Sequence, residues 1–343
     1  MKIFSKETFK ANVEGYTIFD CAFNTVDRFC FLLVEEKESR DILPRTRFLV
    51  LGLDGPKAPR IGYYDTGEMS FSTIARGFDP EEYVAVDTVS KVYSSDSKRR
   101  GEEIPIENLI SLKTPVGTMV TIRRVVRVAG KVYAVGSNRR LYRREGIDQW
   151  VDLHSEGLGA PMPADYHDPK LSGSWSRVMG FRDLSAFNEK DFYAAGGEGD
   201  LWRFDGKAWY QCPLPTNAQL ETVCCAGDGK VYVSDLHGNV WAGREDQWAQ
   251  VARSELSWGS QPVDAFWFKG RMYFGAQEGL YAINDDKELV PLGDLDDGVP
   301  SSMVTGRIDI SPDGNHLLTA GPYGACLFDG QTWTRLFSAY DFR

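Results

Sequence analysis

Apolar residues recur in pairs along the C-terminal part of the chain, with a nearly constant spacing. A first pair such as Phe192-Tyr193 is followed eight or nine residues later by a second pair such as Leu201-Trp202. Each pair lies in a short run of β-branched or aromatic residues, and Gly, Asp, Asn and Ser fill the gap between the pairs. This pattern predicts two strands joined by a tight turn. Five copies occur, and their first pairs are Val132-Tyr133, Phe192-Tyr193, Val231-Tyr232, Met272-Tyr273 and Leu317-Leu318.

Another alternating apolar run and a turn precede every copy, so each repeat holds four strands. Where no insertion intervenes, the repeats recur at 39 to 45 residues, which is the spacing of β-propeller blades. Two weaker copies occupy residues 15–118, and the clear copies occupy residues 119–343. The sequence therefore predicts an all-β fold, a single β-propeller domain over residues 1–343 with seven four-stranded blades. The degenerate N-terminal repeats leave six or eight blades open.

Tryptophan ends four of the five clear repeats, and it is also a member of two of the second apolar pairs. A ligand site is not repeated several times along a chain, so the repetition favours a structural role. Aromatic side chains bury roughly 150–250 Å² each. We therefore expect the repeat tryptophans to fill the layers between blades; they are Trp202, Trp209, Trp241, Trp248 and Trp333.

Short turn motifs in these repeats resemble those of known propeller families. The stretch "SPDGNHLLTAG" at residues 311–321 resembles the strand–turn–strand of WD40-like blades. The stretches "FDGKAW" and "FDGQTW" resemble the second half of an Asp-box, although the leading Ser or Thr of a full Asp-box is missing. The resemblance implies a β-propeller and no particular subfamily. It implies little about function, because superfolds host many unrelated activities.

Charge is distributed unevenly along the sequence. The segment from Lys91 to Glu145 carries a net charge of +8, which leaves −18 for the rest of a chain whose net charge is −10. Sectors of opposite sign favour a charge-steered partner, because such fields raise association rates. The alternative is that arginines simply alternate with core residues on exposed strands. The candidate partner-binding arginines are Arg139, Arg140, Arg143 and Arg144.

A long segment without repeat character separates two of the clear blades, at residues 154–180. Loops longer than about 12–15 residues in compact domains are usually functional or disordered. Aromatic residues and Met on such a loop are typical interface anchors. We expect this inter-blade insertion to carry the partner site on its face of the propeller, with a plain spacer as the alternative. The candidate residues are Met162, Tyr166, His167 and Trp175.

Residues with catalytic or metal-binding chemistry form no recognisable constellation. The six cysteines have no metal-ligand spacing and lie in or beside apolar runs, where free Cys behaves as a small buried hydrophobe. His154, His167 and Asp168 offer only a weak metal signal, because no helical spacing aims them at one ion. The sequence "GGEGD" lies inside a hairpin and is no phosphate loop. We expect no metal, no cofactor and no catalysis.

These observations favour a non-catalytic propeller that binds one protein partner. The most specific hypothesis is a cytoplasmic, immunity-type inhibitor of a bacterial toxin that is monomeric when free and does not associate with membranes. No signal-peptide core is apparent at the start of the sequence. The alternatives are a general assembly or scaffold propeller, a hydrolase- or lyase-like enzyme with a site in the central channel, and a nucleic-acid binder that uses residues 123–144.

Overall fold

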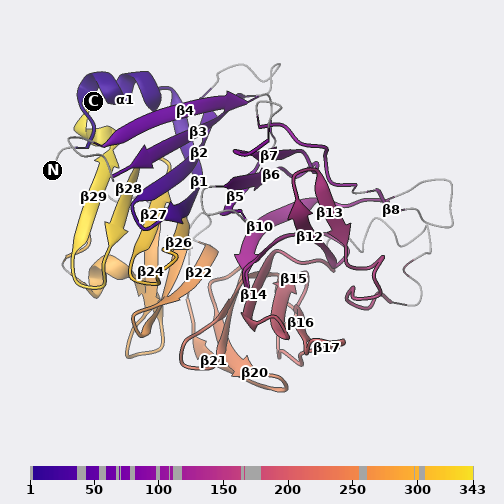
Figure 1. Ribbon diagram of the computed structural model, residues 1–343. Coiled ribbons are helices and arrows are strands. Elements are labelled where there is room, and N and C mark those ends of the chain that lie inside the picture. Colours follow the sequence, from indigo (N-terminus) through magenta and orange to yellow (C-terminus); the bar gives the residue numbers. More distant parts are fainter. Residues whose placement is uncertain are drawn as a thin grey trace.

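The computed structural model describes most of the chain. The described residues are 3–36, 44–53, 59–66, 69, 71–77, 82–97, 101–107, 109–110, 118–163, 166, 179–254, 261–296, 298–300 and 306–342. Within them the protein is a seven-bladed β-propeller, with sheets arranged around a central channel (Figure 1). The prediction of an all-β propeller with seven blades is confirmed.

Each blade is an antiparallel meander whose strands follow one another from the channel outward. Blade 1 holds β1 (Tyr16–Thr25), β2 (Arg28–Glu35), β3 (Thr46–Gly52) and β4 (Arg60–Thr66). Blade 3 holds β10 (Ile122–Val128), β11 (Lys131–Gly136), β12 (Arg140–Gly146) and β13 (Gln149–Asp152), and blade 4 holds β14 (Asp183–Asn188), β15 (Asp191–Gly196), β16 (Asp200–Phe204) and β17 (Trp209–Gln211). Blade 5 holds β18 (Leu220–Cys225), β19 (Val231–Asp235), β20 (Val240–Arg244) and β21 (Gln247–Ala252). Blade 6 holds β22 (Pro262–Phe268), β23 (Arg271–Ala276), β24 (Gly279–Ile283) and β25 (Leu289–Pro291), and blade 7 holds β26 (Arg307–Ile310), β27 (Leu317–Gly321), β28 (Gly324–Phe328) and β29 (Trp333–Ser338).

Blade 2 departs from the four-stranded pattern. Its sheet contains β5 (Thr73–Arg76), β6 (Tyr83–Val86) and β7 (Val92–Ser94), and the isolated bridge between Tyr93 and Glu102 stands where a fourth strand would pair. A separate two-stranded ribbon, β8 (Leu109–Ile110) and β9 (Thr118–Met119), follows before blade 3. The reduced blade explains why the repeat pattern is weak in this part of the sequence.

The apolar pairs of the repeats occupy the second and third strands of each blade. The first pair lies on the second strand and the second pair on the third, so that Val135 pairs with Leu141 and Ala195 pairs with Leu201. Side chains from these strands fill clusters shared by neighbouring blades. One such cluster joins blades 3 and 4 and contains Leu141, Phe192 and Trp209, all of them buried. The predicted hairpins and the core between blades are confirmed.

The repeat tryptophans are buried to different extents. Trp202 and Trp209 are both 7% exposed, whereas Trp241, Trp248 and Trp333 are half-buried. The Trp209 ring packs on Phe181 and Phe204, and its Nε1 donates a hydrogen bond to the carbonyl of Leu158 at 2.9 Å. The two tryptophans of blade 4 therefore fit the expected core role best.

The two ends of the described chain close the ring. Helix α1 (Lys6–Asn12) starts at Ser5, whose hydroxyl accepts a hydrogen bond from the N–H of Thr8. It lies beside the C-terminal end of the chain (Figure 1), where Phe9 stacks on Phe342 with ring centroids 4.6 Å apart. Two short 3-10 helices, η1 (Leu292–Asp294) and η2 (Ala339–Asp341), follow β25 and β29. The apolar cluster of α1 also includes residues of β27 and β29, so it ties blade 1 to blade 7.

All six cysteines are free thiols. Five are buried, and Cys225 is partly buried. Burial raises the pKa of Cys212, Cys224 and Cys326 to about 12, so these thiols stay protonated at neutral pH. The expectation that the cysteines act as small apolar residues agrees with this placement.

The buried ring of Trp209 leads to a stability prediction with a neighbouring control. Trp209→Ala should lower the free energy of unfolding by roughly 3–5 kcal/mol, because it leaves a cavity between blades and an unpaired Leu158 carbonyl. Tyr210 is the next residue on β17 and is 54% exposed, so Tyr210→Ala should change stability by less than about 0.5 kcal/mol. Urea unfolding measures both. Equal losses for the two variants would contradict a core role for Trp209.

Candidate functional site

One polar position recurs on the innermost strand of every blade, and five of the seven residues line a cavity of the central channel. We call these seven residues the polar ring; they are Asp20, Thr73, Arg124, Asp183, Thr222, Asp264 and Arg307. In blades 2, 3, 5 and 7 the ring residue precedes the residue whose backbone N–H donates to a side chain of the preceding blade. Three members are acidic, two are basic and two are threonines.

The polar ring joins the innermost strands to one another. The N–H of Ile74 donates to Asp20 at 2.9 Å, and the N–H of Val125 donates to the hydroxyl of Thr73 at 2.7 Å. In the same way the N–H of Val223 donates to Asp183 of the preceding blade at 2.9 Å, and the N–H of Ile308 donates to Asp264 of the preceding blade at 3.1 Å. These side chains satisfy donors that no strand pairs, because the innermost strand is the edge of its sheet.

The two arginines of the polar ring face its carboxylates. Arg124 forms ion pairs with Asp183, at 3.2 Å, and with Asp264. Arg307 lies 3.9 Å from Asp20 and closes the ring between blades 7 and 1. Burial raises the pKa of Asp20 and of Asp183 to about 6, although the arginines and the backbone donors oppose this shift.

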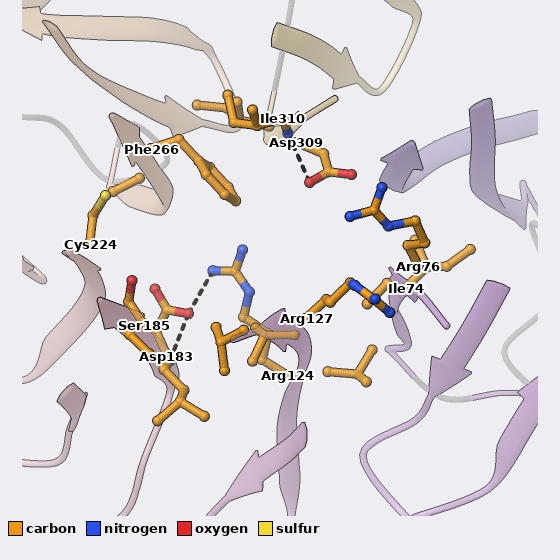
Figure 2. Close-up of a pocket in the computed structure, with 18 of the residues that line it drawn as sticks. Ile74, Arg76, Arg124, Arg127, Asp183, Ser185, Cys224, Phe266, Asp309 and Ile310 are labelled. Atoms are coloured by element: carbon orange, nitrogen blue, oxygen red, sulfur yellow. Dashed lines mark hydrogen bonds and ion pairs between the residues drawn. The ribbon is translucent and has the colours of Figure 1, made fainter. Parts of the chain in front are cut away.

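Beyond the polar ring, the later residues of the innermost strands surround a cavity of about 310 Å³, which we call the inner chamber. Figure 2 shows the Arg124 guanidinium reaching into this space toward Asp183, with Arg76 and Asp309 on the far side. Asp309 accepts hydrogen bonds from the N–H of Phe23 at 2.7 Å and of Ile310 at 2.8 Å. Burial raises the pKa of Asp309 to about 7.

The first residues of the same strands surround the opposite end of the channel. This depression, which we call the arginine mouth, has a volume of about 300 Å³. Arg123, Arg182 and Arg307 line it, together with Glu221, and Arg124 lies at its base. Arg182 donates to Glu221 at 3.0 Å, and the Arg307 guanidinium donates to the carbonyl of Val263 at 3.1 Å.

The inter-blade insertion joins the propeller at the end of the channel that holds the arginine mouth. Gly180 pairs with Ser137 in an isolated bridge, and Met179 lines a second depression of about 270 Å³ beside Arg123 and Arg182. The turns between the second and third strands of blades 3 and 4 reach the same end. We call this end of the propeller the insertion face.

Two of the four candidate arginines lie in the interior. Arg144 is fully buried and forms ion pairs with Glu82 and with Glu103, the latter at 2.7 Å. Arg139 is 7% exposed; it binds both carboxylate oxygens of Asp200 and lies over the Trp202 ring, 4.5 Å from its centroid. Neither side chain is available to a partner, because carboxylates of the folded chain already enclose them. The structure therefore places two of the four candidate partner-binding arginines inside the fold, where they cannot contact a partner.

Arg140 and Arg143 lie nearer the surface but are also paired. Arg140 donates to Asp152 at 2.8 Å, and Arg143 forms ion pairs with Glu145 and with Glu156, the latter at 3.3 Å. Each of the four candidate arginines is thus paired with a carboxylate of the folded chain. The exposed guanidinium in this part of the chain that has no such pair among the described residues is that of Arg123, on β10.

The described part of the insertion packs against the blades. Ala160 is buried in the cluster between blades 3 and 4, and Leu158 packs on the same cluster. Tyr166 is 4% exposed and Met162 is half-buried. Tyr166, a candidate interface residue, is therefore not exposed to a partner. His167 and Trp175 lie outside the described residues.

Other chemistry is sparse in the part of the chain that the structure describes. There, no three His, Cys, Asp or Glu side chains gather to hold a metal ion. The His154 ring lies 3.0 Å from the carbonyl of Ala160 and 3.6 Å from Asp152, so it fixes the start of the insertion. No described helix has the length and apolar character that a membrane crossing requires.

Sequence reasoning missed the arginine mouth. Arg182 and Arg307 come from blades far from Arg123 in the sequence, and only the closed ring brings them together. A usable signal existed in the repeat register. Aligning the innermost strands places Arg123, Arg182 and Glu221 at or beside equivalent positions, each just before the polar-ring residue.

The buried Arg144 triad predicts a large loss of stability. Arg144→Ala leaves Glu82 and Glu103 buried without their cation, and removal of one partner from a buried ion pair costs about 3–5 kcal/mol. Arg143→Ala, at the preceding position, breaks partly exposed pairs and should cost less than about 1 kcal/mol. Urea unfolding of both variants checks this. A stable Arg144→Ala variant with impaired partner binding would instead show that Arg144 contacts the partner.

Asp309 gives the protein a pH dependence whose sign follows from its raised pKa. Asp309 has a pKa of about 7 in the folded chain, whereas the ordinary pKa of an Asp side chain is 3.8. The stabilising contribution of this proton is therefore present at about pH 4 and is lost as the pH rises through 7, by at most roughly 4 kcal/mol.

Thermal melts from pH 5 to 8 test this sign. Asp309→Asn should be destabilised relative to the wild type at pH 5, and the difference should shrink or reverse by pH 8. Asn has one side-chain oxygen fewer to accept a hydrogen bond, and this loss lowers stability by a similar amount at each pH. The change of the stability difference with pH is therefore the decisive quantity. A difference that does not vary with pH would contradict the assignment.

Comparisons with known proteins agree with the fold. No protein-family model matches the chain. The WD40 β-propeller domain of Doa1 superposes with a TM-score of 0.57 at 10% identity, covering 90% of each chain. YCF48 from Cyanidioschyzon merolae superposes with a TM-score of 0.52 at 13% identity, covering 91% of this chain and 95% of the other.

A curated protein is similar in sequence as well. The chain is 30% identical over 223 residues to "Immune protein Tsi7" of Pseudomonas aeruginosa PAO1. The aligned region spans 64% of this chain and 66% of that relative's length. The molecule is thus a seven-bladed β-propeller of WD40-like architecture with sequence similarity to a bacterial immune protein.

Proposed function

We propose that this protein is an immunity protein that binds and neutralises one cognate protein toxin, and that it performs no catalysis. The observation that carries the proposal is the 30% identity over 223 residues with Immune protein Tsi7. Identity at this level over more than half of the chain extends well beyond a shared fold, whose structural neighbours are only 10–13% identical.

The geometry supports binding more than chemistry. The inner chamber holds carboxylates and arginines, the residue types that catalyse many reactions, but hydrogen bonds and ion pairs to neighbouring blades already occupy them. A general acid or base must reach a substrate proton, and these groups are committed to backbone donors. This arrangement favours the binding protein over a hydrolase- or lyase-like enzyme that uses the channel.

The insertion face is the proposed contact surface. It combines the arginine mouth, the depression beside Met179 and the folded start of the insertion. Met162 and Arg140 lie on the chain that builds this face and remain candidate contacts, as do His167 and Trp175. A dedicated inhibitor needs such a built surface, because affinity comes from a few anchors at the centre of an interface.

The proposal includes the cytoplasm as the site of action and a monomer as the free form. Six free thiols, most of them buried, suit a reducing compartment. A general scaffold propeller is the second candidate, since the fold alone is equally suited to it. The similarity to an immune protein favours the toxin inhibitor.

Depletion of the protein in its cell of origin tests the function. Cells that carry the gene under a repressible promoter should lose viability at least about tenfold when it is repressed in contact with kin, and a second copy of the gene should restore survival. Proteins that co-purify with the tagged chain identify the toxin, which must kill when it is expressed alone. Unchanged viability on depletion would reject the immunity role and leave the scaffold.

A further inference from the structure

Arg123 is an exposed cation at the centre of the insertion face. It lines both the arginine mouth and the adjoining depression beside Met179, so its guanidinium stands between two hollows. Within the described residues it forms no ion pair or hydrogen bond, in contrast to Arg124, Arg139 and Arg144. Partial burial and the neighbouring charge of Arg182 lower the pKa of Arg123, which is the signature of a cation that an added anion would stabilise.

The charges around Arg123 leave a local positive excess. Arg182 forms an ion pair with Glu221. Arg124 pairs with the ring carboxylate Asp264, and Arg307 lies near the ring carboxylate Asp20. Glu221 is the acidic residue that lines the mouth, whereas four arginines line it. Because Arg124 and Arg307 face the ring carboxylates, the remaining set of Arg123, Arg182 and Glu221 carries a net charge of +1, and one more carboxylate would neutralise it. A guanidinium presents paired N–H donors that match a carboxylate in a planar, two-bonded geometry.

An apolar contact adjoins the arginines. Phe71 lines the same mouth, is 72% exposed and lies 6.0 Å from the ring of Phe19. Its φ of 49° is in the left-handed region that bulky side chains rarely adopt. An exposed aromatic ring held in this conformation beside a cationic depression is suited to be an interface anchor.

We propose that the arginine mouth binds an acidic segment of the partner protein, in which an Asp or Glu side chain pairs with Arg123 and Arg182 and an adjacent apolar side chain packs on Phe71. The inference rests on the proposed function for the identity of the partner. The chemistry of the bound segment is inferred from the residues that line the arginine mouth. The two adjoining hollows allow the bound segment to run from the channel axis toward the insertion.

A protein carboxylate fits this site better than a nucleic acid. The whole chain has a net charge of −10, so its long-range field repels a polyanion, whereas a single acidic segment meets mainly the local arginines. The mouth is also a depression of about 300 Å³ rather than a basic groove. Single-strand binding proteins use such grooves to follow a phosphate backbone.

Charge reversal at Arg123 tests the proposal in a purified system. The probe is the fluorescein-labelled peptide Gly-Glu-Phe-Glu-Gly, with Gly-Lys-Phe-Lys-Gly as the matched peptide, measured by fluorescence anisotropy at low and at high salt. The acidic peptide should bind the wild type, should bind less at high salt, and should lose at least about tenfold in affinity with Arg123→Glu. Arg271→Glu is the control, because Arg271 is exposed and opens β23 at the opposite end of the channel.

Three results would overturn the proposal: no binding of the acidic peptide to the wild type, equal binding by Arg123→Glu, or tighter Arg123-dependent binding of the oligonucleotide dT8. The last result would assign the mouth to nucleic acid. Circular dichroism and melting of Arg123→Glu confirm that the variant is folded, and Phe71→Ala supplies a second variant that keeps every charge.

The co-purified toxin separates this inference from the proposed function. Arg123→Glu should weaken toxin binding at least about thirtyfold and fail to restore survival to depleted cells, whereas Arg271→Glu should bind the toxin like the wild type and restore survival. An Asp or Glu to Lys change on the toxin should recover binding to Arg123→Glu. If the wild type protects and Arg123→Glu protects equally, the immunity role stands and the acidic-segment site is wrong. If depletion is harmless, the peptide measurement alone decides the site.

Discussion

The structure depends on how the channel-facing edge of each blade satisfies its backbone. The innermost strand of a propeller blade has no neighbour on the channel side, so its N–H groups there need acceptors. In this protein the side chain at one recurring position supplies an acceptor to the next blade in four of the seven blades. The polar ring is therefore both the lining of the channel and the joint between blades.

This arrangement explains why charged residues stand where a core would otherwise be apolar. Asp20 and Asp183 use one oxygen for the N–H of the following residue and the other for the next blade. Arg124 spans two of the ring carboxylates, so the buried charges compensate one another. Such residues are held by the fold, and their presence in a channel does not by itself indicate catalysis.

Ion pairs within the fold also determine which charges are left for a partner. Carboxylates from other blades or nearby turns pair with most arginines of the basic segment, including Arg139 and Arg144. Among the described arginines of this segment, the exposed one without a carboxylate partner is Arg123, in the arginine mouth on the insertion face. A dedicated inhibitor gains specificity from such a local site, because complementary charge speeds and orients encounter while the overall negative charge disfavours polyanions.

The sequence by itself determined the architecture. Apolar pairs at a fixed offset identify hairpins, because alternating side chains must face one core, and the recurrence of Trp209 and its equivalents identifies blades. The immunity-type hypothesis was also reached from the chain alone, by excluding other chemistry. Only the tertiary structure decided where each charge lies. A run such as Arg139 to Arg144 looks basic in one dimension, but the acceptors Glu82, Glu103 and Asp200 come from elsewhere in the chain. The arginine mouth exists because ring closure places the starts of several strands around one axis, and no local pattern records that proximity.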